Sequence, residues 1–514
     1  MDPVTLNSEP KLLTFLCRLH YRRLPIPEIL LAHLNAMLDQ RFAHWPLKTL
    51  LRDRAQFWSF LQERWPIFIR ETDGGRQLAN EPGVDSLRVP GPKHLPFGHD
   101  DVRVFIDTLF SDGILTPIPW DWSEAASERW VRVGLLDPDA QNPALRLEEL
   151  LNSLGSAVPK RDGGTADWQA FALRWAQLRY LWLTTPKANR ERLQAKYGAV
   201  RAKVDDEFSG WMKDVYPRIH NQPALSLPMV HHIPACLARM LSSGEAKRIA
   251  LILVDGLALE QWMAAKAILQ LDLPGVLLEE SASFAWLPSV TPISRQAIFS
   301  GKMPYYFPES LSDTGADEKR WGQFWSGRGL AKHEIGFIAM SGESDSAERV
   351  SEILTEDTKA LGITLYKVDK IMHGMQLGSE GMINQVEQWA RTEALFNLIH
   401  TLLMKGFTVT LTADHGNTEA VGIGAPKQGV LCESRGERNR LFTEKTFADD
   451  CVRASPGSRI AQHSGLPANI IPVIAPPGRA FTDKGQKIVC HGGDSLEEMA
   501  VPFVVLRKHT EGGA

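Results

Sequence analysis

The feature that most restricts the fold is a short apolar run that ends in Asp-Gly, KRIALILVDG at residues 247–256. A run of this length without a polar face is typical of a parallel strand that is buried on both sides. The segment after it, at 257–270, spaces its apolar residues by three and four, which predicts a helix. A strand that leads directly into a helix is the repeating unit of α/β sheets.

The same alternation continues to the end of the chain. Further strands are predicted within 406–416, 468–478 and 500–508, and helices within 347–362 and 384–406. We therefore expect residues 245–514 to form an α/β domain in which helices flank a mostly parallel sheet.

Residues 1–240 have a different pattern. Apolar residues recur at helical spacing within 11–24, 28–42, 55–65 and 168–183, which predicts a mostly α-helical N-terminal region. The stretch from 73 to 100 is dense in Gly and Pro and is predicted to be loop. It is a candidate boundary between two helical subdomains.

The composition is that of an ordinary globular protein. With 514 residues and a formal charge of −4, the chain has room for about three domains and lacks the basic excess of dedicated nucleic-acid binders. A local patch could still bind nucleic acid. The cysteines are scattered and never paired as Cys-x-x-Cys, so any metal must be held by His, Asp or Glu. The N-terminus carries no signal-peptide pattern and no long apolar run is present, so we expect a cytoplasmic protein without a membrane partner.

Acidic residues and histidines follow the predicted strands. Asp255 ends the first strand, and Asp414 and His415 end another. Ligands of open α/β sheets bind beyond the carboxyl ends of the strands, so we expect these residues to face one cleft. Taken alone, Asp255 is better explained by the turn chemistry of Asp-Gly, and His491 by an ordinary loop histidine.

A second pair, Asp369 and His373, lies four residues apart, which places both side chains on one side of a helical turn. An isolated pair of this kind more often belongs to a solvated helix face. Together, however, the candidates can supply two divalent cations with three protein ligands each. Oxygen and imidazole ligands suit zinc best, with manganese or magnesium as alternatives. The candidate ligands are Asp255, Asp369, His373, Asp414, His415 and His491.

A hydroxyl ahead of a helix would complete such a site. In LPSVTPISRQAIFSG at 287–301, Ser289 and Thr291 both precede a helical pattern. A threonine oxygen beside a cation can ionise near neutral pH and attack phosphorus, while the helix N-terminus offers N–H donors to phosphoryl oxygens. The simpler alternative is a helix N-cap. Arg295, one helical turn on, could reach a phosphoryl oxygen or form a salt bridge on the helix surface.

In this order the motifs resemble those of the alkaline phosphatase superfamily: an Asp after the first strand, a Ser or Thr nucleophile, Asp-x-x-x-His, Asp-His-Gly and a final His. The stretch at 288–301 is similar to the nucleophile segment of the phosphodiesterase branch, with Thr291 in the nucleophile position. The resemblance implies two metal sites. One would consist of Asp369, His373 and His491, and the other of Asp255, Asp414, His415 and the Thr291 oxygen.

Within that superfamily the chain resembles the PglZ domain of bacteriophage-exclusion (BREX) and phage-growth-limitation systems. The similar stretches are LPMVHHIPACLARML leading into RIALILVDGLALEQW, the nucleophile segment, and GERNRLF at 436–442. The resemblance implies a cytoplasmic, metal-dependent phosphatase or phosphodiesterase that works with other defence proteins, among them a DNA methyltransferase and ATPases. It leaves the substrate open.

Three functions compete. The first is a two-metal phosphodiesterase or nuclease that acts on nucleic acid or a nucleotide, and the second is a phosphomonoesterase or phosphomutase. Residues 412–419 and 491–505 also resemble cofactor-independent phosphoglycerate mutase, but the nucleophile segment departs from that enzyme. The third is a catalytically silent scaffold, against which the intact ligand set counts.

An insertion at about 425–485 is expected to form part of the cleft rim. Its Arg435, Arg438 and Arg440 could contact a phosphodiester backbone, although exposed arginines are usually solvated surface. The motif segments that follow Asp255, Asp414 and His491 contain no further Lys or Arg. This weakly favours a diester, which carries one negative charge where a monoester carries two.

Overall fold

A computed structural model describes most of the chain. The described residues are 6–21, 27–72, 87–111, 114–119, 131–136, 143–269, 276–310, 315–426, 429–430, 435–461 and 465–508. The chain divides into two units, Met1–Arg146 and Leu147–Ala514. The division therefore falls near residue 146 and not near the residue 240 that the change of sequence pattern suggested.

The smaller unit is mostly helical, as expected. Its helices enclose a core that includes the buried rings of Trp45 and Trp65. Arg64 is also buried, and it donates hydrogen bonds to the carbonyls of Val89 and Pro92, which anchors the end of the Gly- and Pro-rich stretch. Residues 73–86 of that stretch lie outside the described part. The elements are α1 (Glu9–Tyr21), α2 (Glu28–Asp39), α3 (Leu47–Leu50), α4 (Arg54–Thr72), α5 (Asp100–Ser111), β1 (Ile118–Pro119), η4 (Val131–Gly134) and β2 (Leu135–Leu136).

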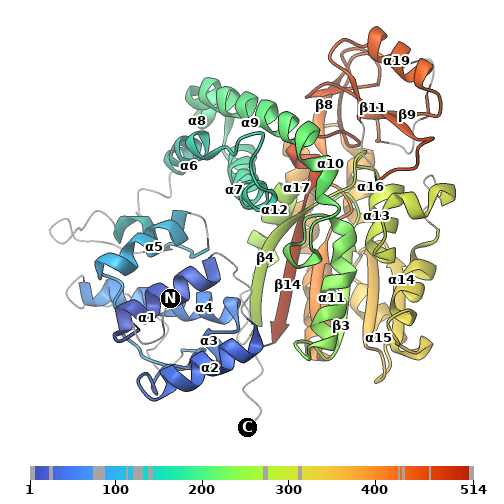
Figure 1. Cartoon of the computed structure of the whole chain (residues 1–514). Helices are drawn as coiled ribbons and strands as arrows, with labels where there is room; N and C mark the ends of the chain where they lie inside the picture. The colour runs from blue at the N-terminus through green and yellow to red at the C-terminus, as the bar shows by residue number, and fades with distance from the viewer. Residues whose placement is uncertain are drawn as a thin grey trace. The chain divides into compact units, whose positions relative to one another are not determined.

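A six-stranded sheet in the order β4-β14-β7-β3-β6-β5 forms the centre of the larger unit (Figure 1). The strands β7, β3, β6 and β5 pair in parallel, while β14 runs antiparallel to both β4 and β7. The predicted mostly parallel sheet is confirmed. Its strands are β3 (Ile249–Val254), β4 (Val276–Phe284), β5 (Ile335–Met340), β6 (Ala360–Leu365), β7 (Thr408–Thr412) and β14 (Ala500–Lys508).

The helices between residues 147 and 242 share the core of this sheet. Phe208 and Trp211 of one helix pack against Phe284 at the end of β4. Gln169 donates hydrogen bonds to the carbonyls of Leu227 and Ala282, which ties a second helix to β4. Periodicity predicts these helices but does not show which surface they cover. They are α6 (Pro143–Ala157), α7 (Thr165–Thr184), α8 (Lys187–Arg190), α9 (Gln194–Asp214), α10 (Tyr216–Ile219) and α11 (Ile233–Ser242).

Apart from α19, which packs within the insertion between β7 and β14, the remaining helices lie along the sheet and at its carboxyl edge (Figure 1). The helix predicted at 347–362 ends at Ile353, and β6 begins at Ala360 instead. The segment 384–406 contains two helices, separated by Glu393 with a φ of 60°. The helices are α12 (Leu259–Leu269), α13 (Thr291–Ser300), α14 (Asp317–Ser326), α15 (Ser346–Ile353), α16 (Lys367–Gly374), α17 (Gly378–Arg391), α18 (Ala394–Met404), α19 (Lys445–Ala454) and α20 (Leu496–Met499).

Short 3₁₀ turns connect several of these helices. They are η6 (Glu191–Leu193), η7 (Ala224–Ser226), η8 (Val230–His232), η9 (Pro304–Tyr306), η10 (Pro308–Ser310) and η11 (Lys332–Glu334). No helix in the described part of the chain is both long enough and apolar enough to cross a membrane. Among the described cysteines, Cys17, Cys236, Cys451 and Cys490 are free thiols, while Cys432 lies outside the described residues.

The insertion between β7 and β14 builds two small sheets of its own. One is antiparallel, in the order β10-β11-β9, and packs with α19 around Phe442, Cys451 and Phe481. The strand predicted at 468–478 belongs here and not to the central sheet. The second small sheet has the order β12-β8-β13. The strands are β8 (Thr418–Gly422), β9 (Asn439–Phe442), β10 (Arg459–Ile460), β11 (Ile471–Ile474), β12 (Arg479–Ala480) and β13 (Lys487–Cys490).

Candidate active site

The central sheet brings the candidate residues to one edge. Strands β7, β3 and β6 are parallel neighbours, with Leu253 opposite Thr412 and Val254 opposite Leu365. Asp255 follows β3 directly, and Asp414 lies two residues beyond the end of β7. The helix α16, which carries Asp369 and His373, follows β6, and α13 begins at Thr291 after β4. The carboxyl edge of the sheet therefore presents every predicted motif up to Asp-His-Gly, as expected for an open α/β sheet.

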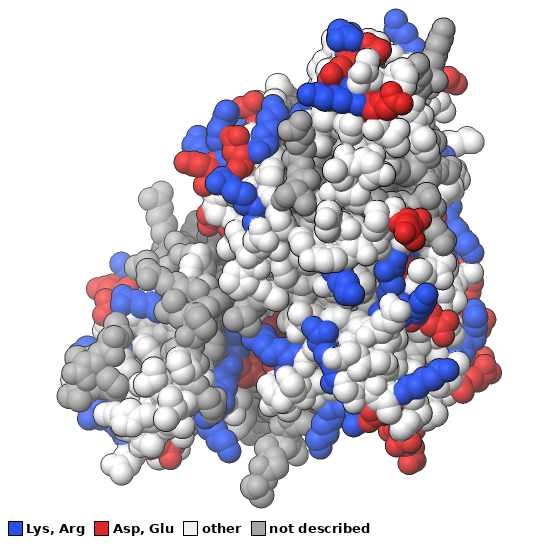
Figure 2. Space-filling model, turned by 45° about the vertical axis from the view of Figure 1, so that its right-hand side comes forward, with Lys and Arg blue, Asp and Glu red and all other residues white. Residues whose placement is uncertain are grey.

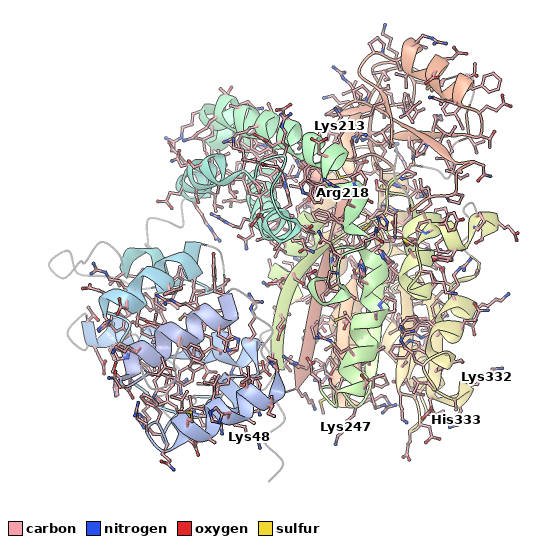
Figure 3. The ribbon with its side chains drawn as sticks, viewed as in Figure 1. Lys48, Lys213, Arg218, Lys247, Lys332 and His333 are labelled. Atoms are coloured by element: carbon pink, nitrogen blue, oxygen red, sulfur yellow. The ribbon has the colours of Figure 1, made fainter. Side chains whose placement is uncertain are left out.

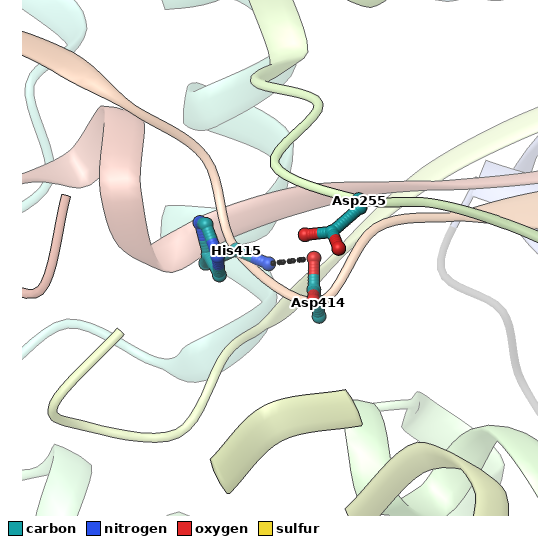
Figure 4. Close-up of side chains that lie close together, drawn as sticks. All are labelled: Asp255, Asp414 and His415. Carbon is teal, nitrogen blue, oxygen red and sulfur yellow. Dashed lines mark hydrogen bonds between the residues drawn. The ribbon is translucent and has the colours of Figure 1, made fainter. Parts of the chain in front are cut away.

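Asp255, Asp414 and His415 form a buried cluster whose ligand atoms lie within 4.8 Å of one another (Figure 4). The backbone holds the Asp414 carboxylate, because its Oδ1 accepts hydrogen bonds from the N–H groups of Gly256 at 3.0 Å and His415 at 3.1 Å. Gly256 has a φ of 72°, a left-handed conformation that glycine adopts at little cost. Two carboxylates and one imidazole at this spacing are a suitable donor set for zinc or manganese.

The hydroxyl of Thr291 lies against this cluster. Its Oγ1 is 3.0 Å from His415 Nε2 and 3.3 Å from Asp255 Oδ1. Thr291 is the first residue of α13, and its side chain is buried. The hydroxyl is thus held between two candidate metal ligands at the N-terminus of a helix.

His415 and His491 are both oriented by backbone carbonyls. Nδ1 of His415 donates to Gly416 O and Nδ1 of His491 donates to Ser289 O, each at 2.9 Å. These partners assign the tautomer that leaves Nε2 with a lone pair for a metal. The two rings are stacked with their centroids 4.0 Å apart. Burial lowers the pKa of His415 to about 4, while burial and the neighbouring His415 lower the pKa of His491. Both rings are therefore neutral at pH 7, the form that binds metals.

Asp369 and His373 face each other on α16, with His373 Nε2 at 3.3 Å from Asp369 Oδ1. Burial and the charge of Asp255 raise the pKa of Asp369 to about 6. Because α16 follows β6, the strand beside β3, this pair and the first cluster lie at the same edge of the sheet. A cation between the carboxylates would offset their repulsion. Among the described residues, Asp255, Asp414 and His415 are the group of three ligands within 4.8 Å of one another, and Asp369, His373 and His491 do not form a second such group.

Arg295 is buried, so of its two predicted roles the salt bridge on the helix surface is wrong. Its Nη1 donates to Asp255 Oδ2 at 2.6 Å, and its Nε lies 2.8 Å from Asp317 Oδ2. Burial raises the pKa of Asp317 to about 6. Sequence reasoning missed Asp317, because it stands in α14 outside every motif and no local pattern connects it with Arg295.

Ser289 has a structural role that the sequence did not reveal. Its hydroxyl donates to Gly493 O at 2.7 Å and accepts a hydrogen bond from Gly492 N at 3.1 Å. Together with the bond from His491 Nδ1 to the Ser289 carbonyl, these contacts fasten the nucleophile segment to the His491 loop. The hydroxyl of Thr291, and not that of Ser289, adjoins Asp255 and His415.

Arg438 and Arg440 do not lie on an exposed rim. Arg438 is fully buried, pairs with Glu498 and donates to the carbonyls of Pro476 and Arg479. Arg440 is also buried and donates to the carbonyls of Asn439 and Phe481. Both guanidinium groups hold the insertion together, so the expected contact with a phosphodiester backbone has no support in this geometry.

Residues 235–506 match the family model described as the BREX system PglZ alkaline phosphatase-like domain, which is more than half of the chain. The chain belongs to the PglZ family. The match begins within α11 and ends within β14, so Thr291 and all six candidate ligands lie inside the PglZ domain. The helices α7 to α10 precede the match although they share the core of its sheet.

Several solved structures are weakly similar to the PglZ chain. Murine ectonucleotide pyrophosphatase/phosphodiesterase 5 is 14% identical with a TM-score of 0.38, covering 51% of this chain and 90% of that one. Its human counterpart is 14% identical with a TM-score of 0.37, covering 50% and 87%. Phosphonoacetate hydrolase from Sinorhizobium meliloti 1021 is 14% identical with a TM-score of 0.29, covering 50% and 89%. These low values carry no conclusion about activity. No curated protein matches the chain.

Proposed function

We propose that this PglZ chain is a phosphoric ester hydrolase that uses the Thr291 hydroxyl as nucleophile beside two divalent cations, and that it prefers phosphodiesters. The observation that carries the proposal is the position of Thr291 Oγ1, between His415 Nε2 at 3.0 Å and Asp255 Oδ1 at 3.3 Å. A hydroxyl at this position would share a cation with both ligands. Membership of an alkaline phosphatase-like family supports the same chemistry.

We assign the ligands to the two sets that the resemblance implies. Cations held there, zinc by preference and manganese or magnesium as alternatives, would supply the positive charge that favours an ionised hydroxyl and a charged transition state. Thr291 stands at the first position of α13, so its hydroxyl lies at the N-terminal end of the helix. Pro292 has no N–H, and the N–H groups of Ile293 and Ser294 donate to Val290 O, so the cations and not the helix would supply most of the stabilisation. Asp255, Asp414, His415 and Thr291 would hold one cation, and Asp369, His373 and His491 the other.

The balance of charge supports a diester substrate. Four carboxylates and one guanidinium lie in or directly beside the site, and two divalent cations would leave about one positive charge before the Thr291 hydroxyl ionises. One charge matches a diester, whereas a monoester carries two. Arg295 is already engaged by two of the carboxylates, which reduces its use as a phosphate ligand. The charged groups are Asp255, Asp317, Asp369, Asp414 and Arg295.

The positions of the exposed basic residues indicate where a substrate larger than a simple ester would extend. On the face drawn in Figure 2, Lys and Arg are interspersed with Asp and Glu. Lys247, Lys332 and His333 precede β3 and β5, at the end of the sheet opposite the site (Figure 3). Lys213 and Arg218 instead flank Tyr216, whose hydroxyl accepts a hydrogen bond from Leu287 N at the start of the nucleophile segment. Both side chains are exposed, and Arg218 donates to Asp214 O at 2.6 Å. A nucleotide or a nucleic-acid strand that extends beyond the site would meet them first if it passes Tyr216.

Family membership supports a role in a BREX-type defence system. There the chain would act in the cytoplasm on nucleic-acid or nucleotide phosphodiesters, together with other defence proteins such as a DNA methyltransferase and ATPases. A phosphomonoesterase, a phosphomutase and a silent scaffold are the competing functions.

The test is the hydrolysis of bis-para-nitrophenyl phosphate and para-nitrophenyl phosphate with added zinc, manganese or magnesium. We expect a higher kcat/KM for the diester, and loss of activity toward both esters in Asp414→Ala. A clear monoester preference would replace the diesterase with a phosphatase. A wild-type chain that stays inactive and binds no metal would favour the scaffold.

A further inference from the structure

One short segment of the insertion, 435–440, supports the loop that carries His491. The N–H of His491 donates to Arg435 O at 2.8 Å, and the N–H of Arg438 donates to His491 O at 3.1 Å. Both main-chain polar groups of His491 are thus engaged by the insertion. The imidazole, in turn, is oriented from the other side by the Ser289 carbonyl.

The two glycines after His491 pack so closely against this segment that neither position has room for a side chain. Gly492 has a φ of 103°, and a Cβ there would lie 2.2 Å from Asn439 Nδ2. A Cβ on Gly493 would lie 2.7 Å from the Arg438 guanidinium, and the Gly493 N–H donates to Glu498 Oε1 at 2.7 Å. Because Glu498 also pairs with Arg438, the His491 loop, α20 and the insertion form one hydrogen-bonded block.

Arg435 extends this block to the other histidine of the same proposed cation site. Its Nη2 donates to the backbone carbonyl of His373 at 2.6 Å. His373 lies in the last turn of α16, where helical carbonyls lack intrahelical partners and a positive charge is favourable. Arg435 therefore contacts His491 through its main chain and His373 through its side chain.

The backbone of Arg435 indicates that this position is held in place by its surroundings. Its φ is 67°, in the left-handed region that residues with a Cβ rarely adopt. Such a conformation persists only where neighbouring contacts require it. The bonds to His373 and His491 are two such contacts.

We propose that Arg435 is a positioning residue that sets the spacing of His373 and His491 and so assembles the second cation site. This inference rests on the proposed function, in which Asp369, His373 and His491 share a cation. It gives the insertion a task in metal binding, in place of the substrate contact expected from its arginines. Residues that orient metal ligands in this way typically change metal affinity by about 10- to 100-fold when they are replaced.

The experiment measures zinc binding by equilibrium dialysis and elemental analysis, without reference to activity. Wild-type protein should bind two equivalents, and Asp369→Ala should lose one of them. Arg435→Ala should keep one equivalent at wild-type affinity and bind the other about tenfold more weakly. Arg453→Ala is the matched control, because Arg453 is an exposed arginine of the same insertion that contacts Asp450, and it should leave both equivalents unchanged.

Arg435→Gly separates the side chain from the backbone conformation, since glycine accepts the positive φ and keeps the carbonyl that binds His491. It should weaken the same equivalent as Arg435→Ala. Two equivalents bound at wild-type affinity by both variants would overturn the positioning role and leave the proposed function standing. Fewer than two equivalents in the wild-type protein would remove the two-cation function and, with it, this inference.

Discussion

Arg295 and Asp255 form a buried ion pair at the centre of the proposed site, with Nη1 at 2.6 Å from Oδ2 and side chains that are only 2% and 4% exposed. The pair leaves Asp255 Oδ1 directed toward the Thr291 hydroxyl. Burial alone would lower the pKa of Arg295, but the carboxylates of Asp255 and Asp317 raise it instead. Arg295 is therefore permanently charged, and it orients a candidate metal ligand from the helix that begins with Thr291, the proposed nucleophile.

Replacement of Arg295 should lower the stability of the folded protein. In Arg295→Ala two buried carboxylates lose their counterion, and breaking a buried pair costs about 3 to 5 kcal/mol. In EDTA, Arg295→Ala should unfold at a lower temperature than the wild-type protein. Added zinc should raise the unfolding temperature of the variant more than that of the wild type, because a cation would neutralise Asp255. Differential scanning calorimetry with and without zinc measures both effects. Arg349→Ala, on the exposed side of α15, serves as control, and equal zinc-induced shifts in all three proteins would contradict the expectation.

Thr291 and Ser289 should respond differently to the loss of their hydroxyls. Thr291→Ala should lower kcat/KM for the diester by about 1000-fold, because it removes the nucleophile, whereas Thr291→Ser should retain much of the activity. Ser289→Ala removes two bonds to the His491 loop and should cost about tenfold, with weaker zinc binding. Steady-state kinetics at saturating zinc separate the two roles. Near-normal turnover by Thr291→Ala would reassign the nucleophile.

Local sequence was sufficient for the framework of the site. The run at 249–254 is apolar on both faces, and the run at 408–412 alternates Thr with Val and Leu, so both strands and the acidic residues after them could be predicted together. The sequence of β14 also predicts a buried strand. Its antiparallel direction could not be predicted, because it depends on the path of the insertion that connects β7 with β14. The domain boundary was expected near residue 240 because periodicity predicts helices but not their partners. It does not show that Phe208 and Trp211 pack on Phe284.

Residues whose partners are remote in sequence could not be identified in this way. Arg438 and Arg440 stand in a polar segment that is typical of exposed loop, yet burial and hydrogen bonds to remote carbonyls make them internal supports. Asp317 and Arg295 meet only because α13 packs against α14. Such ion pairs follow from tertiary packing, for which a single sequence carries no periodic signal.

The Arg438 and Glu498 pair gives a test of the supporting role. Both side chains are completely buried. Arg438→Met should destabilise the protein by about 3 to 5 kcal/mol, because Glu498 is left as an uncompensated charge, and Arg438→Met with Glu498→Gln should recover part of that loss. The unfolding temperature measures the effect. A contribution to substrate binding would instead raise KM at unchanged stability, and that result would return Arg438 to the substrate.

The smaller unit contains a buried histidine whose protonation opposes folding. The His20 side chain is 5% exposed, stacks on Phe57, and donates from Nε2 to Leu50 O at 2.6 Å. Burial lowers the pKa of His20 to about 4, with a smaller contribution from Arg54. Because an unfolded histidine has a pKa near 6.5, the unfolded chain binds more protons than the folded one between about pH 4 and 6.5.

This difference predicts a loss of stability in weak acid. Above about pH 6.5 the ring is neutral in both states and contributes no pH dependence, whereas between pH 6.5 and 4 the free energy of unfolding should fall by about 3 kcal/mol through His20 alone. His20→Gln keeps a neutral donor for Leu50 O and should lose correspondingly less over the same range. Hydrogen exchange of peptides from α1 and α4 in the full chain, corrected for intrinsic rates, reports the difference between the two proteins. Parallel pH profiles for wild type and variant would show that His20 is not the group responsible.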